Sequence, residues 1–352
     1  MKNHWKSWIG IVISVGILYA AFYRIDFRLL LKNLQGANYL YLFPIVFIIF
    51  VNMALRAVRW GYLLRPIKKI GFPNLFEGIL IGFMANNVLP VRMGEFVRAY
   101  IIGRSERIRK SASFATVMVE RLFDGLTVLG LLVVVLLFIH LPPENIHFKK
   151  ALHMGGYITV AIYGFTFVIL AIIKTQTRWF LKTALFFTRP FPSRVAKNGI
   201  STIKSFKEGL VSVESTRTML ISFGYSLVIW AVFAYSIYLM GLSFGLQLSI
   251  SATAMVLLAI CLAMMIPSTP GYIGPYHASV AYALVLYNIP LEKALSFSLV
   301  FHAANYIPIT VAGFLYLWKH HLSLRKIREE EQKTEKKGTD QQTTGLRPSF
   351  PH

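Results

Sequence analysis

The chain has little charge and almost no cysteine. Only 15% of its 352 residues are charged, against about 25% in an average soluble domain, and 55% are apolar. One soluble core cannot bury that much apolar surface, so lipid must cover the remainder. This excludes a soluble enzyme, a DNA-binding protein and a disordered regulator. The single cysteine, Cys261, excludes an internal disulfide and a cysteine-rich metal site.

Sequence signatures of enzymes are also missing. The chain contains no glycine-rich phosphate loop of the GxxxxGK[ST] type, no HExxH and no Asp-rich magnesium motif. We therefore expect no cofactor, no metal, no nucleic-acid partner and no enzymatic activity. Glu120 and Asp124 form a carboxylate pair of the kind that performs acid–base chemistry, so residue type alone leaves a membrane enzyme open.

Six apolar runs are long enough to be membrane spans, which need about 20 residues. They cover residues 8–23, 39–60, 114–140, 151–173, 219–241 and 294–318. The first run also resembles a cleaved signal peptide, but no small-residue cleavage site follows it, so we interpret it as a span.

Two further apolar stretches, 72–103 and 249–287, are interrupted by residues that break helices. Each stretch is therefore predicted to form two shorter helices that meet at a turn inside the membrane, a re-entrant hairpin. The residues expected at the two turns are Pro90, Gly94, Pro267, Ser268, Thr269, Pro270, Gly271 and Gly274.

The distribution of basic residues predicts the topology. The net charge is +22, and in membrane proteins Lys and Arg gather on cytoplasmic loops. If both hairpins leave on the side they entered, segments 56–69, 104–110, 174–217 and the tail all lie inside. Only six of the 37 basic residues then lie outside: Arg24, Arg28, Lys32, Lys149, Lys150 and Lys293. We expect a protein of the cytoplasmic membrane with both termini in the cytoplasm.

The two halves of the chain then repeat with opposite orientation. Each half has a span, a hairpin and a span, and Pro90-x-x-x-Gly94 matches Pro267-x-x-x-Gly271. This favours an inverted repeat, which in transporters places a site at the membrane midplane. The expected fold is an all-α membrane domain over residues 1–318. Its basic connector, 174–217, is either a helix on the membrane surface or an ordinary cytoplasmic segment. The tail, 319–352, is expected to be mostly disordered.

Ionisable side chains at membrane depth are costly and are the first candidates for a functional site. The first hairpin carries Arg92, Glu95 and Arg98, and the next span carries Glu120, Arg121 and Asp124. Such a cluster either fastens the hairpin to the span through ion pairs, or leaves an Arg available to bind a phosphate. We favour phosphate binding.

Neutral polar residues accompany these charges. Asn86 and Asn87 end the first arm of the first hairpin, where they either cap exposed carbonyl groups or line a polar cavity. Around the second hairpin, the candidates for polar lining are Tyr276, His277, His302 and Asn305. Each histidine is either a packed, hydrogen-bonded residue or a proton carrier.

Three segments resemble the lysylphosphatidylglycerol synthase transmembrane family, also called the flippase-like or UPF0104 group. They are Asn86-Asn-Val-Leu-Pro-Val-Arg-Met-Gly-Glu-Phe-Val-Arg-Ala-Tyr100, the Val-Glu-Arg-Leu-Phe-Asp run that ends at Asp124, and Ile266-Pro-Ser-Thr-Pro-Gly-Tyr-Ile-Gly274. In bifunctional members this region looks like a flippase for aminoacylated phosphatidylglycerol, joined to a soluble aminoacyl-transferase domain. The chain stops soon after its last span, so we expect that domain and its lysyltransferase activity to be absent. Other relatives are joined to polyprenyl-phosphate sugar transferases.

Together these features predict a transporter or flippase of a phosphate-containing lipid, either aminoacyl-phosphatidylglycerol-like or polyprenyl-phosphate-linked. The expected partners are anionic or phosphate-containing membrane lipids. Two alternatives stay open: a membrane enzyme that modifies a lipid headgroup, and a non-catalytic partner of a lipid synthase or glycosyltransferase.

Overall fold

The computed structural model describes residues 25–89, 93–138, 215–265 and 270–319, with single positions between 154 and 168. These residues form helices and connecting loops only. The expected first span, 8–23, the connector between 174 and 214, the tail from 320, and most of the run 151–173 lie outside the described residues. The elements are α2 (Phe27–Gln35), η1 (Tyr39–Tyr41), α3 (Leu42–Leu64), α4 (Phe72–Val88), α5 (Gly94–Ser105), α6 (Lys110–Phe138), α10 (Thr216–Ser243), α11 (Ile250–Met265), η5 (Pro270–Tyr272), α12 (Ile273–Val285) and α13 (Leu291–Lys319).

Several helices have the length and composition of membrane spans. Three in the described part of the chain qualify fully: Tyr39–Leu64, Thr216–Ser243 and Leu291–Lys319. Helix α6 is also 29 residues long, but it carries Glu120, Arg121 and Asp124. The expectation of an all-helical membrane protein is therefore confirmed.

Each interrupted stretch contains two short helices, as the sequence predicted. In the first, α4 has 17 residues and α5 has 12. In the second, α11 has 16 residues and α12 has 13. All four are shorter than the roughly 20 residues of a span, and the two helices of each pair pack against each other. Re-entry into the membrane stays a prediction.

Two glycines at the breaks are needed for backbone reasons. A Cβ on Gly94 would collide with the carbonyl oxygen of Gly82, so only glycine lets α5 approach α4 this closely. Gly271 has a φ of 76°, in the left-handed region that glycine adopts without strain. The neighbouring turn residues Pro90, Arg92, Pro267, Ser268 and Thr269 lie outside the described part of the chain.

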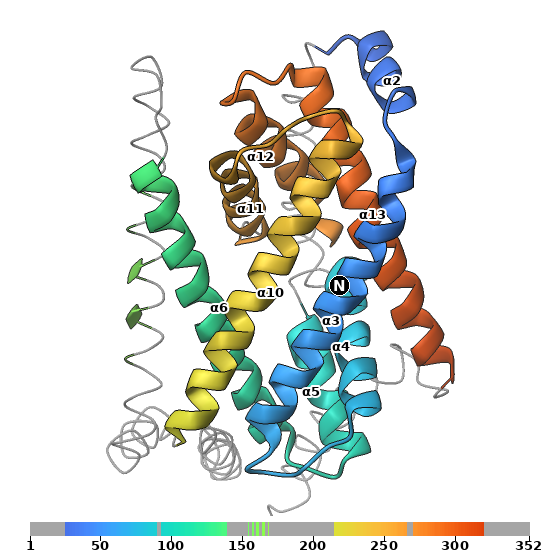
Figure 1. The fold of residues 1–352 in the computed structure, drawn as a ribbon. Helices are drawn as coiled ribbons and strands as arrows, with labels where there is room; N and C mark the ends of the chain where they lie inside the picture. The colour runs from blue at the N-terminus through green and yellow to red at the C-terminus, as the bar shows by residue number, and fades with distance from the viewer. Residues whose placement is uncertain are drawn as a thin grey trace, which may run out of the picture.

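The helices pack in pairs that link the two halves of the chain. Helix α3 packs against α10, α4 against α13, and α6 against α11. Figure 1 shows α4 and α5 toward the lower end of the molecule, with α11 and α12 toward the upper end. Exchanging the two halves maps these pairs onto one another. This is the packing that an inverted repeat requires, although the repeat itself stays a prediction.

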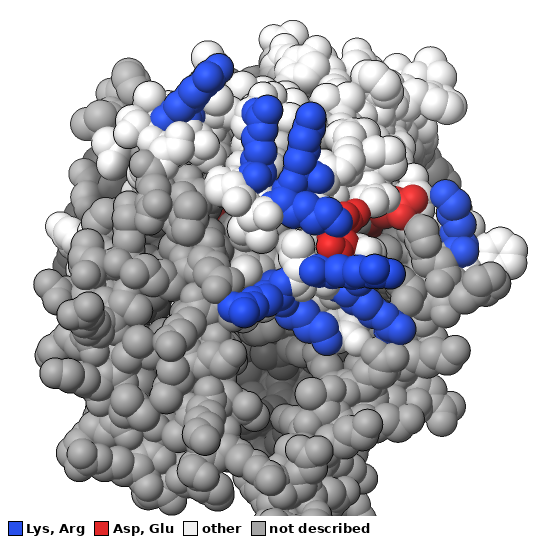
Figure 2. Space-filling view, turned by 90° about the horizontal axis from the view of Figure 1, so that it is seen from below, with Lys and Arg blue, Asp and Glu red and all other residues white. Residues whose placement is uncertain are grey.

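The lower end of the molecule is strongly basic. Figure 2, viewed from below, shows Lys and Arg side chains clustered on this face. The loops here and the adjoining helix ends carry Arg65, Lys68, Lys69, Arg104, Arg107, Arg109, Lys110 and Arg217. The described residues at the upper end carry only Arg28, Lys32 and Lys293. The charge asymmetry therefore agrees with the expected sorting of loops.

Candidate functional site

A buried cluster of ion pairs joins α3, α6 and α10. Its centre is Arg59, which is fully buried. Arg59 Nη1 lies 2.5 Å from Asp124 Oδ1, and Arg59 Nη2 lies 2.6 Å from Glu120 Oε1. Arg59 Nη1 also donates to Ser226 Oγ at 2.5 Å. Short contacts between fully buried, charged groups hold these three helices in a defined register.

Three more arginines share the same two acids. Arg98 Nη1 lies 3.0 Å from Glu120 Oε2. Arg121 Nη2 lies 3.0 Å from Glu120 Oε1 and 3.1 Å from Asp124 Oδ2. Arg56 Nη1 is more distant, 3.6 Å from Asp124 Oδ2. Four arginines therefore surround two carboxylates, and these contacts leave an excess of positive charge.

The structure corrects the predicted end of the second span and adds two arginines to the site. The second span does not end at Trp60, because α3 continues to Leu64. The prediction of a loop over 56–69 was therefore wrong for residues 56–64, which belong to α3: Arg56 is 6% exposed and Arg59 is 0% exposed. Sequence reasoning missed both as site residues. Their signal was the spacing of three residues, which places two arginines on one face of an apolar helix.

Of the six predicted ionisable residues, Arg98, Glu120, Arg121 and Asp124 meet in this cluster. Glu95 lines the adjoining cavity, and Arg92 lies outside the described residues.

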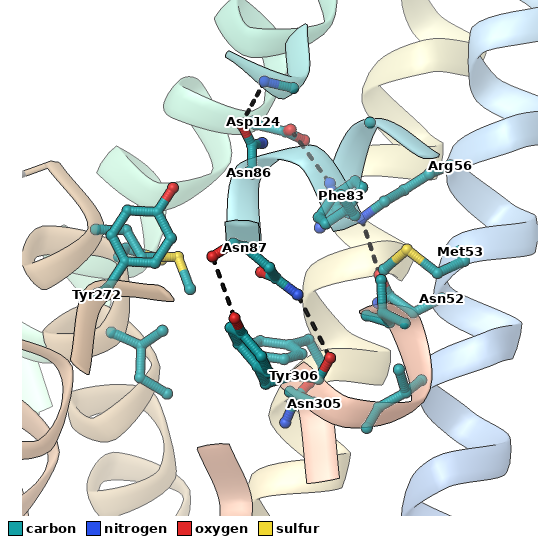
Figure 3. A pocket seen from close by; sticks show the side chains of 18 of the residues that line it. Asn52, Met53, Arg56, Phe83, Asn86, Asn87, Asp124, Tyr272, Asn305 and Tyr306 are labelled. Atoms are coloured by element: carbon teal, nitrogen blue, oxygen red, sulfur yellow. Dashed lines mark hydrogen bonds and ion pairs between the residues drawn. The ribbon is translucent and has the colours of Figure 1, made fainter. Parts of the chain in front are cut away.

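A cavity of about 240 Å³ lies beside the ion-pair cluster, between the two short-helix pairs. Its charged lining residues are Arg56, Glu95, Arg98, Arg121 and Asp124. Arg56 extends from α3 toward Asp124, and Tyr272 lies on the opposite side (Figure 3). Arg56 Nη1 faces Asp124, whereas Arg56 Nε donates to Asn52 Oδ1 at 2.9 Å. Its guanidinium also lies over the rings of Phe83 and Trp230, at 5.2 and 5.7 Å from their centroids.

Two helices begin at this cavity. Gly94 opens α5, and its backbone N–H donates to Asn86 Oδ1 at 2.7 Å. Tyr272 precedes α12 with a φ of 58°, and η5 packs against α4. Both Gly94 and Tyr272 line the cavity, so the described parts of the two turns face a shared space, as the inverted repeat required. Helix amino-termini carry partial positive charge and favour anions.

Asn86 and Asn87 lie at the edge of the cavity, where the sequence left open a lining role. Both line the cavity, and Asn86 also caps the start of α5. Asn87 Nδ2 donates to Thr310 Oγ1 at 2.8 Å, and Tyr306 Oη donates to the Asn87 carbonyl oxygen at 3.3 Å. These bonds tie α4 to α13 at the edge of the cavity (Figure 3).

The histidine pair lies on the other side of the cavity. His277 Nδ1 lies 2.8 Å from Ser298 Oγ, and His277 Nε2 lies 3.3 Å from His302 Nδ1. The ring of Tyr276 stacks on His302 with centroids 4.4 Å apart. Tyr276, His302 and Asn305 line the cavity, whereas His277 lies among its neighbours with 4% of its surface exposed. Gly274 is buried in the first turn of α12.

Four hydrogen-bond donors on residues that line the cavity are unpaired. Arg98 Nη2, Arg121 Nε, Tyr276 Oη and Trp230 Nε1 are buried and have no hydrogen-bond partner among the described residues. An unpaired buried donor costs about 1–3 kcal/mol, so a ligand acceptor at these groups is favoured. Among the same described residues, no three His, Cys, Asp or Glu side chains lie close enough together to hold a metal ion.

A model of the lysylphosphatidylglycerol synthase transmembrane region matches residues 7–313. The chain belongs to this family. Its similarity to curated relatives covers most of both chains. A UPF0104 membrane protein of Methanothermobacter thermautotrophicus is 26% identical over 277 residues, which cover 76% of this chain and 82% of the relative. One of Pyrococcus horikoshii is 24% identical, over 89% of this chain and 97% of the relative.

Another relative is named for glycosyl transfer. Glycosyltransferase AglD of Haloferax volcanii is 40% identical over 89 residues, which cover 24% of this chain and 14% of AglD. No solved structure matches the chain. The family and the relatives agree with the prediction of a membrane protein that carries the transmembrane region.

Proposed function

We propose that the cavity binds the phosphate of a membrane lipid and that the protein moves this lipid between the leaflets. The observation that carries the proposal is the charge of the site. Counting Glu95, the described residues at the site comprise four arginines and three acids, a sum of +1. A buried excess charge is costly unless an opposite charge compensates it, and a phosphate supplies that charge.

The two helix starts and Arg98 strengthen this argument. The amino-terminal ends of α5 and α12 direct their dipoles toward the cavity, which adds partial positive charge. Arg98 already uses Nη1 for Glu120, while its Nη2 is unpaired in the described structure. An arginine with one such nitrogen available is suited to a phosphate oxygen.

A lipid is favoured over a soluble anion because of the surroundings. The cavity is also lined by the apolar residues Ile49, Met53, Val128 and Ile260. The helices around it expose apolar side chains on their outer surfaces, for example Phe47 and Leu220. A ligand with a charged headgroup and apolar tails satisfies both environments. Sites between opposed broken helices are typical of secondary transporters.

The orientation follows from the basic face. We propose that the lower end in Figure 2 faces the cytoplasm of the cell membrane, because basic loops stay on that side and meet anionic lipid. We propose transport without chemical change of the lipid.

The second candidate is a partner of a glycosyltransferase. It is favoured by the similarity to part of AglD, a protein named for glycosyl transfer. In that role the domain would present a lipid phosphate to a separate catalytic domain. The same headgroup site serves both functions.

Leaflet exchange in reconstituted vesicles tests the proposal. The full chain is placed in phosphatidylcholine vesicles with traces of chain-labelled phosphatidylglycerol or phosphatidylinositol, and outer-leaflet label is bleached with dithionite. We expect complete bleaching, with the recovered lipid chemically unchanged. Arg98→Gln should slow exchange roughly tenfold to a hundredfold, the effect of one charge-assisted hydrogen bond. The control is Arg65→Gln, an exposed change on the basic face.

The Arg98 variant should fold, since Glu120 retains Arg59 at 2.6 Å and Arg121 at 3.0 Å. Vesicles in which neither labelled lipid exchanges faster than without protein would contradict the transport proposal. A chemically altered lipid would instead show that the domain is an enzyme.

A further inference from the structure

The two sides of the cavity differ in charge. All five charged lining residues come from α3, α5 and α6 in the first half of the chain. The lining residues from the second half include Trp230, Tyr272, Tyr276, His302 and Asn305, and none of these described residues is Asp, Glu, Lys or Arg. We infer that the headgroup is also two-sided: a phosphate bonded to a neutral, hydroxylated ring such as a sugar or cyclic polyol. This inference rests on the proposed function.

The charge sum excludes the main competing headgroup. The described site sums to +1, and an aminoacyl headgroup of the lysyl type carries two ammonium groups beside one phosphate, which also sums to +1. Like charges repel most strongly in a buried, low-dielectric site. A phosphate diester bearing a neutral ring sums to −1 and complements the site. None of the described lining residues from the second half is a carboxylate that could receive an ammonium group.

The chemistry of the second side fits a hydroxylated ring. Such a ring presents apolar C–H faces, which pack on aromatic surfaces, and hydroxyls around its edge, which need donors and acceptors. Tyr272 and Tyr306 supply rings, and Asn305 supplies an amide whose Nδ2 donates to Phe301 O at 2.9 Å. Pockets that orient a ligand combine aromatic walls with a few polar groups in this way.

Two unpaired donors distinguish this side from a wall that merely accommodates acyl chains. Tyr276 is 2% exposed, and its hydroxyl has no hydrogen-bond partner within the described structure. Trp230 Nε1 is also unpaired there. An acyl chain has no acceptor for either group, whereas the oxygens of a hydroxylated ring accept from both.

The single thiol of the chain allows a binding test. Cys261 lies on α11 and lines the cavity, so a ligand in the cavity should slow its reaction with N-ethylmaleimide. The purified full chain is held in micelles of an uncharged detergent. Phosphatidylglycerol, phosphatidylinositol or lysyl-phosphatidylglycerol with the same acyl chains is added at equal mole fraction. The first two lipids have the same charge, and only the second carries a ring.

We expect phosphatidylinositol to slow the alkylation of Cys261 at a roughly threefold to tenfold lower mole fraction than phosphatidylglycerol, the effect of one neutral hydrogen bond. Lysyl-phosphatidylglycerol should leave the rate unchanged. Tyr276→Phe removes only the hydroxyl, and it should reduce the advantage of phosphatidylinositol over phosphatidylglycerol. The control is Tyr235→Phe on α10, because Tyr235 is 53% exposed and does not line the cavity.

The outcomes separate this inference from the proposed function. Equal protection by phosphatidylglycerol and phosphatidylinositol would overturn the ring site while supporting phosphate binding. Strongest protection by lysyl-phosphatidylglycerol would overturn the charge argument. Protection by none of the three lipids, or protection that Arg98→Gln leaves intact, would overturn the phosphate site itself.

Discussion

Glu120 is the residue whose removal tests the ion-pair cluster most directly. It is fully buried and contacts three arginines: Arg59 at 2.6 Å, and Arg98 and Arg121 at 3.0 Å each. Glu120→Gln preserves size and one acceptor oxygen but removes the charge. Each contact then changes from a charge-assisted to a neutral hydrogen bond, a loss of about 1 kcal/mol per contact.

The remaining charges set the total. After the substitution, four arginines share Asp124 and Glu95, and the excess of positive charge rises from +1 to +2. Removing one partner of a buried ion pair typically costs about 3–5 kcal/mol. The three weakened contacts sum to the lower end of that range. We therefore expect Glu120→Gln to lower the free energy of unfolding by about 3–5 kcal/mol.

The assay is unfolding of the purified protein in mixed detergent–SDS micelles, followed by tryptophan fluorescence. Arg59→Gln together with Glu120→Gln removes an acid and a base, so the double variant should be more stable than the sum of the single changes predicts. The control is Glu106→Gln, which breaks the surface pair with Lys68 (2.7 Å) and should cost less than about 1 kcal/mol. A change of less than about 1 kcal/mol for Glu120→Gln would refute a structural role for the cluster.

Three further predictions concern other parts of the molecule. Gly94→Ala should destabilise the protein by about 1–3 kcal/mol in the same assay, because its Cβ has no room, whereas Gly130→Ala, with no atom within 4 Å, should not destabilise it. The hydrogen bond from Lys68 lowers the pKa of Glu106. The ionised Glu106 therefore stabilises the fold above the ordinary carboxyl pKa, and this stabilisation is lost as pH falls through the lowered value. Glu106→Gln should remove that part of the pH dependence of the free energy of unfolding. In a Cys261→Ala background, a cysteine at Asn288 should react with an impermeant thiol reagent from outside the cell and one at Lys69 should not; the reverse pattern would overturn the orientation.

The helical pairs show which features local sequence controls. Glycine and proline act on their own backbone and that of their neighbours, so their positions in 72–103 and 249–287 sufficed to predict two helices in each stretch. The structure ends α4 at Val88 and starts α5 at Gly94. The collision that makes Gly94 necessary was not predictable, because it involves Gly82 on the other helix.

The charge cluster shows where local reasoning ends. Glu120, Arg121 and Asp124 were recognisable because they interrupt an otherwise apolar run. Arg56 and Arg59 were misassigned because they lie near the end of a run, where arginine also reaches the membrane surface. Only the packing of α3 against α6 and α10 reveals that both arginines are buried beside Asp124.

The neutral lining of the cavity was the hardest part to predict. Tyr276, His302 and Asn305 were chosen because they lie near the second turn, but Asn52, Trp230 and Tyr306 carry no comparable signal. Aromatic and amide side chains occur on many membrane helices, facing lipid or neighbouring helices. Which of them surround a cavity depends on how helices distant in sequence rotate against one another.

The sequence by itself determined that lipid surrounds the protein and that the fold is all-helical. It also determined where the two interrupted stretches break and how unequally the charge is distributed along the chain. These follow from composition and from interactions between near neighbours. The tertiary structure alone decided that four arginines meet two acids, that the described parts of both turns face one cavity, and that its charge lies on one side. The physical reason is that Coulomb and hydrogen-bond energies depend on distances in space, and residues 56, 98, 121 and 276 become neighbours of one cavity only when their helices pack.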